Sequence, residues 1–121
     1  MELVNGEGLV VLKPVGRIDH TNAAVFQTEL TPYLDSCLSG GARILLDFSG
    51  VEYISSVGLR VIMMAAKLLK PVSGGIFVAG LQPVVREIFK ISRFDYVLPI
   101  YDDPETAKLQ IASAANREAG Q

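Results

Sequence analysis

The sequence predicts a single α/β domain built on a four- to five-stranded mixed, mostly parallel sheet with about four helices. Short runs rich in Ile, Leu, Val and Phe alternate along the chain with longer segments whose apolar residues recur at helical spacing. The 121 residues are enough for one domain with a buried core. We assign residues 1–115 to this domain. Residues 116–121 are small and polar, and we expect them to form a flexible C-terminal tail.

The N-terminal part predicts a β-hairpin followed by a helix. A short strand over residues 2–5 can pair with the β-rich segment 8–18 across a Gly-Glu-Gly turn. The run Asp19-His20-Thr21-Asn22 supplies candidate N-cap side chains, and apolar residues recur at helical spacing after it. We expect Gly40-Gly41 to end this first helix.

The middle of the chain predicts a buried strand and a second helix. Residues 43–48, with the sequence RILLDF, form an apolar run typical of a central parallel strand covered on both faces. Residues 49–54 are interpreted as a linker. The second helix then begins at the serine pair, with Ser55 as its N-cap, and stops before Pro71.

The C-terminal part predicts two strands and two helices. The apolar run 75–80 and residues 97–101 are the strands. Gln82-Pro83 opens the third helix, and Asp103-Pro104-Glu105 opens the last. The expected buried stripe of the third helix consists of Val84, Val85, Ile88 and Phe89.

Composition narrows the classes of partner and ligand. The net charge is −2 and the basic residues are scattered, which argues against a nucleic-acid partner. A single cysteine, Cys37, and no Cys or His cluster at metal-ligand spacing predict no metal site and a reducing compartment. There is no Gly-rich phosphate loop, and we expect no cofactor. With no secretory signal and no apolar run longer than residues 61–66, the chain is predicted to be cytoplasmic, without a membrane partner.

The most informative stretch is LDFSGVEYISSVGLRVIMMAAKLL, residues 46–69, in which a buried strand leads to two serines at the start of a helix. It resembles the signature of the STAS domain family, named for sulfate transporters and anti-sigma-factor antagonists, and within that family the free-standing antagonists, or anti-anti-sigma factors. The matching positions are Asp47, Ile54, Ser56 and Gly58-Leu59. The resemblance extends over nearly the whole chain, through Gly16-Arg17-Ile18-Asp19 before the first helix and residues 83–89 in the third.

The resemblance implies a regulatory binding protein and not an enzyme, with no catalytic residue. In the antagonists the serine equivalent to Ser56 is phosphorylated by a partner anti-sigma factor that is also a serine protein kinase, and a serine phosphatase reverses the modification. The unmodified form binds the anti-sigma factor and thereby releases a sigma factor. Familiar members carry Asp where this chain has Ser55, so Ser55 is the second candidate for phosphorylation.

The physics of such a switch is independent of the resemblance. A serine in the first turn of a helix lies beside unpaired backbone N–H groups and the positive end of the helix dipole, where a phosphate is tolerated. The same phosphate adds a charge of about −1.5 to −2 to a surface that a partner must desolvate. Phosphorylation of Ser56 is therefore expected to block binding without unfolding the domain.

We predict one partner-binding face, made of Asp19, Ser55, Ser56, Gly58, Arg60, Met63 and Met64. Asp19 is included because binding sites collect at strand ends in α/β folds. Adjacent methionines on a helix cannot both face the core, so at least one should join Arg60 and Lys67 in an adaptable contact patch. A side chain at Gly58 is expected to obstruct the partner or the adjoining strand and to weaken binding more than folding.

The same residues also fit three other interpretations. The serine pair can be an ordinary N-cap and its neighbour. The domain can be a STAS adaptor module of another signalling or transport-associated complex, because fold and partner are loosely linked. A serine hydrolase with Ser56 as nucleophile is the weakest alternative, since the chain lacks the Gly-x-Ser-x-Gly elbow and no motif ties its sole histidine, His20, to Ser56.

Overall fold

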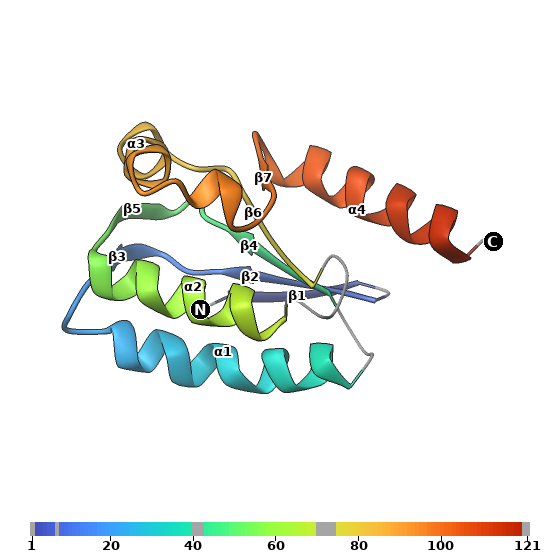
Figure 1. Cartoon of the computed structure of the whole chain (residues 1–121), viewed down its shortest axis with the longest axis horizontal. Helices are drawn as coiled ribbons and strands as arrows, with labels where there is room; N and C mark the ends of the chain where they lie inside the picture. The colour runs from blue at the N-terminus through green and yellow to red at the C-terminus, as the bar shows by residue number, and fades with distance from the viewer. Residues whose placement is uncertain (1, 7, 40–42, 70–74, 120–121) are drawn as a thin grey trace.

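A five-stranded sheet in the order β1-β2-β4-β6-β7 organises the fold (Figure 1). The computed structural model describes residues 2–6, 8–39, 43–69 and 75–119. The strands are β1 (Glu2–Gly6), β2 (Leu9–Lys13), β4 (Arg43–Asp47), β6 (Ile76–Ala79) and β7 (Ile100–Tyr101). β1 and β2 form the predicted antiparallel hairpin, and the other neighbouring pairs are parallel. The position of β4 confirms the predicted central parallel strand.

A separate two-stranded parallel sheet joins β3 (Gly16–Ile18) to β5 (Val51–Ile54). The prediction of a linker over residues 49–54 is therefore wrong. β5 buries its first and last residues and exposes Glu52 between them, so it lacks the alternation that identifies a strand in a sequence. Its partner strand β3 precedes the first helix in the sequence, whereas β5 follows that helix. No local sequence pattern can predict a pairing between segments so far apart.

Helices cover both faces of the five-stranded sheet (Figure 1). α1 (Ala23–Leu38) and α2 (Ser56–Leu68) lie on one face, α4 (Pro104–Ala119) lies on the other, and α3 (Pro83–Ile91) packs beside β5. Ile44 and Leu46 of β4 join the core of α1, α2 and α3, whereas Leu45 packs in the cluster that contains α4. Because both faces are covered, β4 appears in the sequence as an unbroken apolar run.

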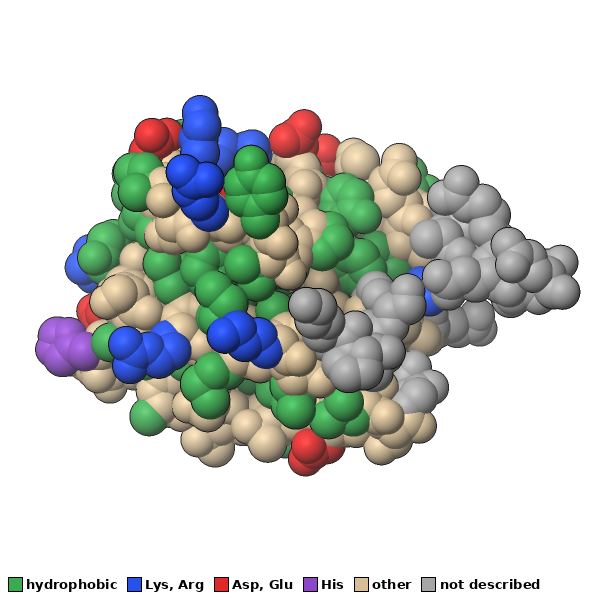
Figure 2. Space-filling view, viewed as in Figure 1, with side chains coloured by type: hydrophobic (Ala, Val, Ile, Leu, Met, Phe, Trp, Pro, Cys, Tyr) green, Lys and Arg blue, Asp and Glu red, His purple; other side chains and the backbone are tan. Residues whose placement is uncertain are grey.

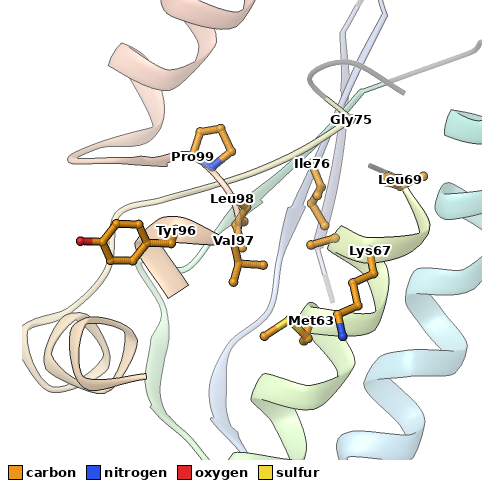
Figure 3. A pocket seen from close by; sticks show the side chains of 10 residues that line it. Met63, Lys67, Leu69, Gly75, Ile76, Tyr96, Val97, Leu98 and Pro99 are labelled. Carbon is orange, nitrogen blue, oxygen red and sulfur yellow. The ribbon is translucent and has the colours of Figure 1, made fainter. Parts of the chain in front are cut away.

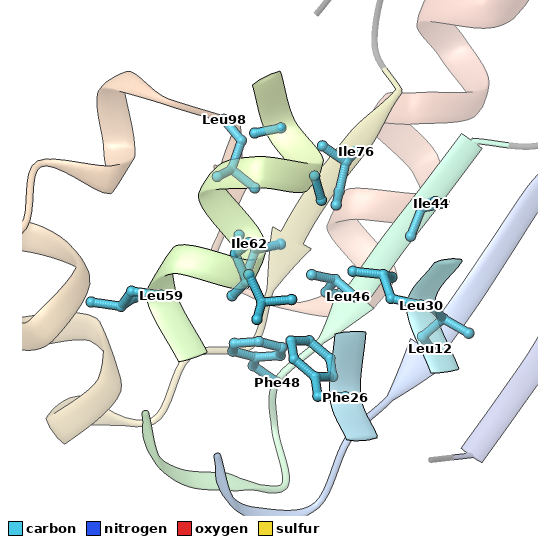
Figure 4. Close-up of a cluster of buried hydrophobic side chains, with 14 of the residues drawn as sticks. Leu12, Phe26, Leu30, Ile44, Leu46, Phe48, Leu59, Ile62, Ile76 and Leu98 are labelled. Atoms are coloured by element: carbon cyan, nitrogen blue, oxygen red, sulfur yellow. The ribbon is translucent and has the colours of Figure 1, made fainter. Parts of the chain in front are cut away.

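The larger core lies between the sheet and α1, α2 and α3 (Figure 4). Phe48, which follows β4, contacts Phe89 of α3 edge to face, with 6.0 Å between the ring centroids. Val85 is also buried, but Val84 is 58% exposed, so the predicted stripe of α3 is wrong at that residue. Adjacent residues of a helix point in different directions, and the narrow contact of α3 buries only one of the two valines.

The last strand is shorter in the structure than the sequence predicts. A 3-10 turn, η1 (Phe94–Tyr96), precedes β7. The backbone N–H groups of Val97 and Leu98 both donate to the Phe94 carbonyl oxygen, at 2.9 and 3.2 Å. Val97, Leu98 and Pro99 therefore lie outside the strand, and only Ile100 and Tyr101 of the predicted strand over residues 97–101 pair with β6.

The C-terminal helix begins as predicted. The Asp103 carboxylate accepts a hydrogen bond from the Thr106 backbone N–H at 2.7 Å, which caps the first turn of α4. The helical backbone continues to Ala119, past the predicted boundary at residue 115, and a flexible tail stays a prediction. Gly40-Gly41 and Pro71, the predicted stops of the first two helices, lie outside the described residues. None of the helices in the described part of the chain combines the length and apolarity that a membrane span requires.

Candidate protein-binding site around Ser56

Two strand ends bring the predicted site together. β3 and β5 pair in parallel with Ile18 opposite Ile54, so the residues that follow them leave the same end of the small sheet. The Ser55 backbone N–H donates to the Ile18 carbonyl oxygen at 2.8 Å. The loop that starts at Asp19 therefore lies beside the first turn of α2.

The two serines differ in what their hydroxyl groups do. Ser55 is half-buried and is the N-cap of α2, because its Oγ accepts a hydrogen bond from the Gly58 backbone N–H at 3.4 Å. This confirms the predicted cap. Ser56 is the first helical residue and is exposed, and its hydroxyl makes no hydrogen bond to any other described residue. A modifying enzyme can therefore reach Ser56 without breaking a contact that holds the helix.

Ser55→Ala is expected to lower the free energy of unfolding by about 0.5–1 kcal/mol, near the lower end for a lost N-cap because the existing bond is long. Urea denaturation followed by circular dichroism measures this loss. Ser56→Ala is the matched control and should cost no more than a few tenths of a kcal/mol, roughly the effect of a surface substitution. A larger loss for Ser56→Ala would reassign the cap.

The loop at Asp19 is held by its own side chains. Asp19 Oδ1 accepts hydrogen bonds from the Thr21 hydroxyl at 2.6 Å and the Thr21 backbone N–H at 3.0 Å. Asn22 accepts from the Asp19 backbone N–H at 2.8 Å and donates to the Arg17 carbonyl oxygen at 2.7 Å. The bonds from Thr21 lower the pKa of the Asp19 carboxyl, with smaller contributions from the charges of His20 and Arg17. Asp19 thus presents a stable negative charge at this end of the site.

Gly58 lies beneath the predicted face and not on it. It is buried, and a Cβ atom there would stand 2.8 Å from Ile18 Cγ2 and 2.8 Å from Ile54 Cγ1. The missing side chain lets the first turn of α2 approach β3 and β5 closely. The geometry therefore directs the effect of a bulky residue at Gly58 toward folding, against the expectation from sequence that binding suffers more.

Asp47, the acidic residue among those that carry the resemblance, shapes the chain that leads to the serines. It is only 6% exposed and ends β4. Its carboxylate accepts hydrogen bonds from the backbone N–H and the hydroxyl of Ser49, and Lys13 Nζ lies 4.0 Å from its other oxygen. These contacts hold the turn between β4 and β5. Asp47 therefore has a structural role in this turn.

An exposed ridge runs along α2 from Ser56. Ser56, Arg60 and Met63 follow one another at spacings of four and three residues, which places them on one side of the helix. Arg60 is exposed and Met63 half-buried. Met64 is 51% exposed on the adjacent flank, so the expectation of at least one surface methionine is confirmed.

The ridge ends at a groove that the sequence did not predict (Figure 3). An open cavity of about 400 Å³ lies between the second half of α2, the start of β6 and the segment that joins η1 to β7. Its walls include Met63 and Lys67 from α2 and Tyr96, Val97 and Leu98 from the far side. No sequence signal marks the last three residues, because only tertiary packing brings residues 96–99 opposite α2.

Comparisons with known proteins agree with this architecture. The pattern that defines the family described as STAS domain matches residues 1–107. The chain is 34% identical over 111 residues to BtrV of Bordetella bronchiseptica, whose name describes it as a candidate anti-sigma factor antagonist, and the match covers 92% of this chain and 93% of BtrV. Both chains are thus compared over almost their full lengths.

Solved structures share the fold at lower identity. An anti-sigma factor antagonist from Mycobacterium paratuberculosis superposes with a TM-score of 0.81 at 21% identity, covering 92% of each chain. The Bacillus cell fate determinant SpoIIAA in its phosphorylated form gives a TM-score of 0.67 at 18% identity, covering 91% of this chain and 97% of SpoIIAA. The arrangement of strands and helices around Ser56 is therefore one that other proteins also adopt.

Proposed function

Because this chain belongs to the STAS domain family, we propose that it is an anti-sigma-factor antagonist whose binding is switched off by phosphorylation of Ser56. Antagonists of this family are regulatory binding proteins and not enzymes. The proposed partner is an anti-sigma factor that is also a serine protein kinase, and a serine phosphatase restores the binding form. The switch is proposed to operate in the cytoplasm.

The observation that carries the proposal is the exposed position of Ser56 at the start of α2. The unpaired N–H groups of the first helical turn and the helix dipole favour an anion at this position, so the folded domain tolerates a phosphate. A partner that covers Ser56 must instead desolvate a charge of about −1.5 to −2. Folding and binding therefore respond in opposite ways to one modification.

The proposed contact surface consists of Asp19, Ser55, Ser56, Arg60, Met63 and Met64, above the buried Gly58. Its support is the shared end of β3 and β5, where Asp19 and Ser55 emerge together, and the ridge along α2. A relative named as an antagonist and a neighbour solved in a phosphorylated form point in the same direction.

The test is a phosphorylation assay with the anti-sigma factor kinase that the unmodified protein retains from native lysate. After incubation with ATP, mass spectrometry of the digested protein should place one phosphate on Ser56. Ser55→Ala should be phosphorylated at an unchanged rate, because its hydroxyl is used for capping, and Ser56→Ala should not be phosphorylated. Phosphate on Ser55, or on neither serine, contradicts the proposal.

A further inference from the structure

We propose that the groove beyond Met63 is a second anchoring point for the partner and that it receives an acidic amphipathic helix. The inference rests on the proposed function in one respect: the same partner covers Ser56.

The groove exposes apolar surface that nothing in the described chain covers. Tyr96 is 81% exposed at its rim, and Met63 and Val97 are half-buried on opposite walls (Figure 3). Ile76 and Leu98 close the floor and are themselves buried. An apolar hollow of this kind, rimmed by polar groups, is typical of a site that takes an apolar side chain from a partner.

The charges on α2 beside the groove favour a partner segment that is negatively charged. α2 contains Arg60 and Lys67 and no Asp or Glu, and neither cation forms an ion pair with another described residue. Figure 2 shows Lys and Arg side chains over α2, and near α3 a mixed group in which Lys or Arg and Asp or Glu side chains stand together, with hydrophobic side chains between the two groups. The whole chain has a net charge of −2, so attraction of an acidic segment must come from this local arrangement.

The spacing fits a helix laid along α2. Arg60 and Lys67 are seven residues apart, which is two helical turns or about 10 Å. Carboxylates spaced by two turns on a partner helix can face both cations, while an apolar residue between them enters the groove. Ser56 and Lys67 are eleven residues apart, about 16 Å along the axis, so one short helix spans both points.

This arrangement also explains how a partner detects the phosphate. A helix that carries carboxylates toward Arg60 brings negative charge close to Ser56, which lies one turn away. A phosphate on Ser56 then repels the partner segment directly and competes with it for Arg60. Arg60 and Lys67 therefore bind the acidic helix only while Ser56 is unmodified.

Two synthetic 15-residue amphipathic peptides test the inference, one with glutamates spaced by seven residues and leucines between them, the other with every glutamate replaced by lysine. Each is titrated into the uniformly 15N-labelled protein while amide shifts are recorded by NMR. The acidic peptide should shift amides of residues 63–69 and 96–99, and the basic peptide should not bind. Lys67→Glu should weaken binding of the acidic peptide about fivefold or more, as expected when a charge that contacts the peptide is reversed.

Lys108→Glu on α4 makes the same charge change outside the groove and should leave the affinity unchanged. Tyr96→Ala removes an exposed wall with little effect on folding and should also weaken binding. Equal binding of both peptides, shifts on another surface, or no binding of the acidic peptide overturns the inference. So does a concentration-dependent dimer in ultracentrifugation that Tyr96→Ala abolishes, because a second copy then fills the groove. These outcomes do not bear on Ser56 phosphorylation, which mass spectrometry reads separately.

Discussion

Ser56→Asp is expected to fold normally and to bind the anti-sigma factor about 10- to 100-fold more weakly than the unmodified protein, a loss of about 1.4–2.8 kcal/mol, because the partner must desolvate the added charge. Ser56 is exposed and its hydroxyl holds no other described residue, so the fold loses nothing by the change. A carboxylate at a helix N-terminus is worth about 0.3–1 kcal/mol, which should slightly raise the free energy of unfolding. Isothermal titration calorimetry and urea denaturation measure the two effects.

Ser56→Asn is the matched control, because asparagine has nearly the shape of aspartate without its charge. It should bind within a few-fold of the unmodified protein, and Ser56→Ala should bind constitutively in the presence of the kinase and ATP. If Ser56→Asn loses as much affinity as Ser56→Asp, shape and not charge controls the interface. If both the aspartate variant and the phosphorylated protein bind at full strength, the domain is a constitutive binder.

Gly58→Val is expected to lower the free energy of unfolding by about 2–3 kcal/mol, in the upper part of the range for overpacking a core. The new Cβ would stand 2.8 Å from a carbon of Ile18 and from a carbon of Ile54, and 3.3 Å from the Ile18 carbonyl oxygen. To relieve these contacts, α2 must move away from β3 and β5. That movement also strains the bond from the Ser55 N–H to the Ile18 carbonyl oxygen.

Met64→Val places the same β-branched side chain on the exposed surface of α2 and should cost less than about 1 kcal/mol, the scale of its helix propensity. Urea denaturation of the two variants gives the comparison. Partner affinity should be measured below the transition, where Gly58→Val is still folded. A Gly58→Val protein with undiminished stability and lost affinity would place Gly58 in direct contact with the partner.

Local chemistry explains what could be predicted around Ser56. A serine before an apolar helical run is a capping signal that depends on neighbours three residues away, and Ser55 caps α2 accordingly. The continuous apolar run of β4 likewise predicts that both faces of this strand are buried. The position of Ser56 as the first residue of a helix therefore followed from residues that adjoin it in the chain.

Three features that the sequence did not predict share one physical cause, which is dependence on residues distant in the sequence. The pattern of residues 49–54 predicts a linker because the pairing of β5 with β3 is not encoded in that pattern. The sequence places Gly58 on the surface because helix periodicity does not show how closely the strands approach beneath it. The groove escaped prediction because Tyr96 and Val97 meet α2 only through the turn at η1.

The α/β class, the central strand and the start of the helix that carries Ser56 can be predicted from the sequence alone, because hydrophobic periodicity and helix capping are local interactions. The folded domain is needed to see that Asp19 and Ser55 emerge from one small sheet, that Gly58 lies beneath the site, and that the ridge from Ser56 ends in an apolar groove. These features arise from contacts between segments that are far apart in the chain. Such contacts depend on the packing of the whole domain, and no single segment records them.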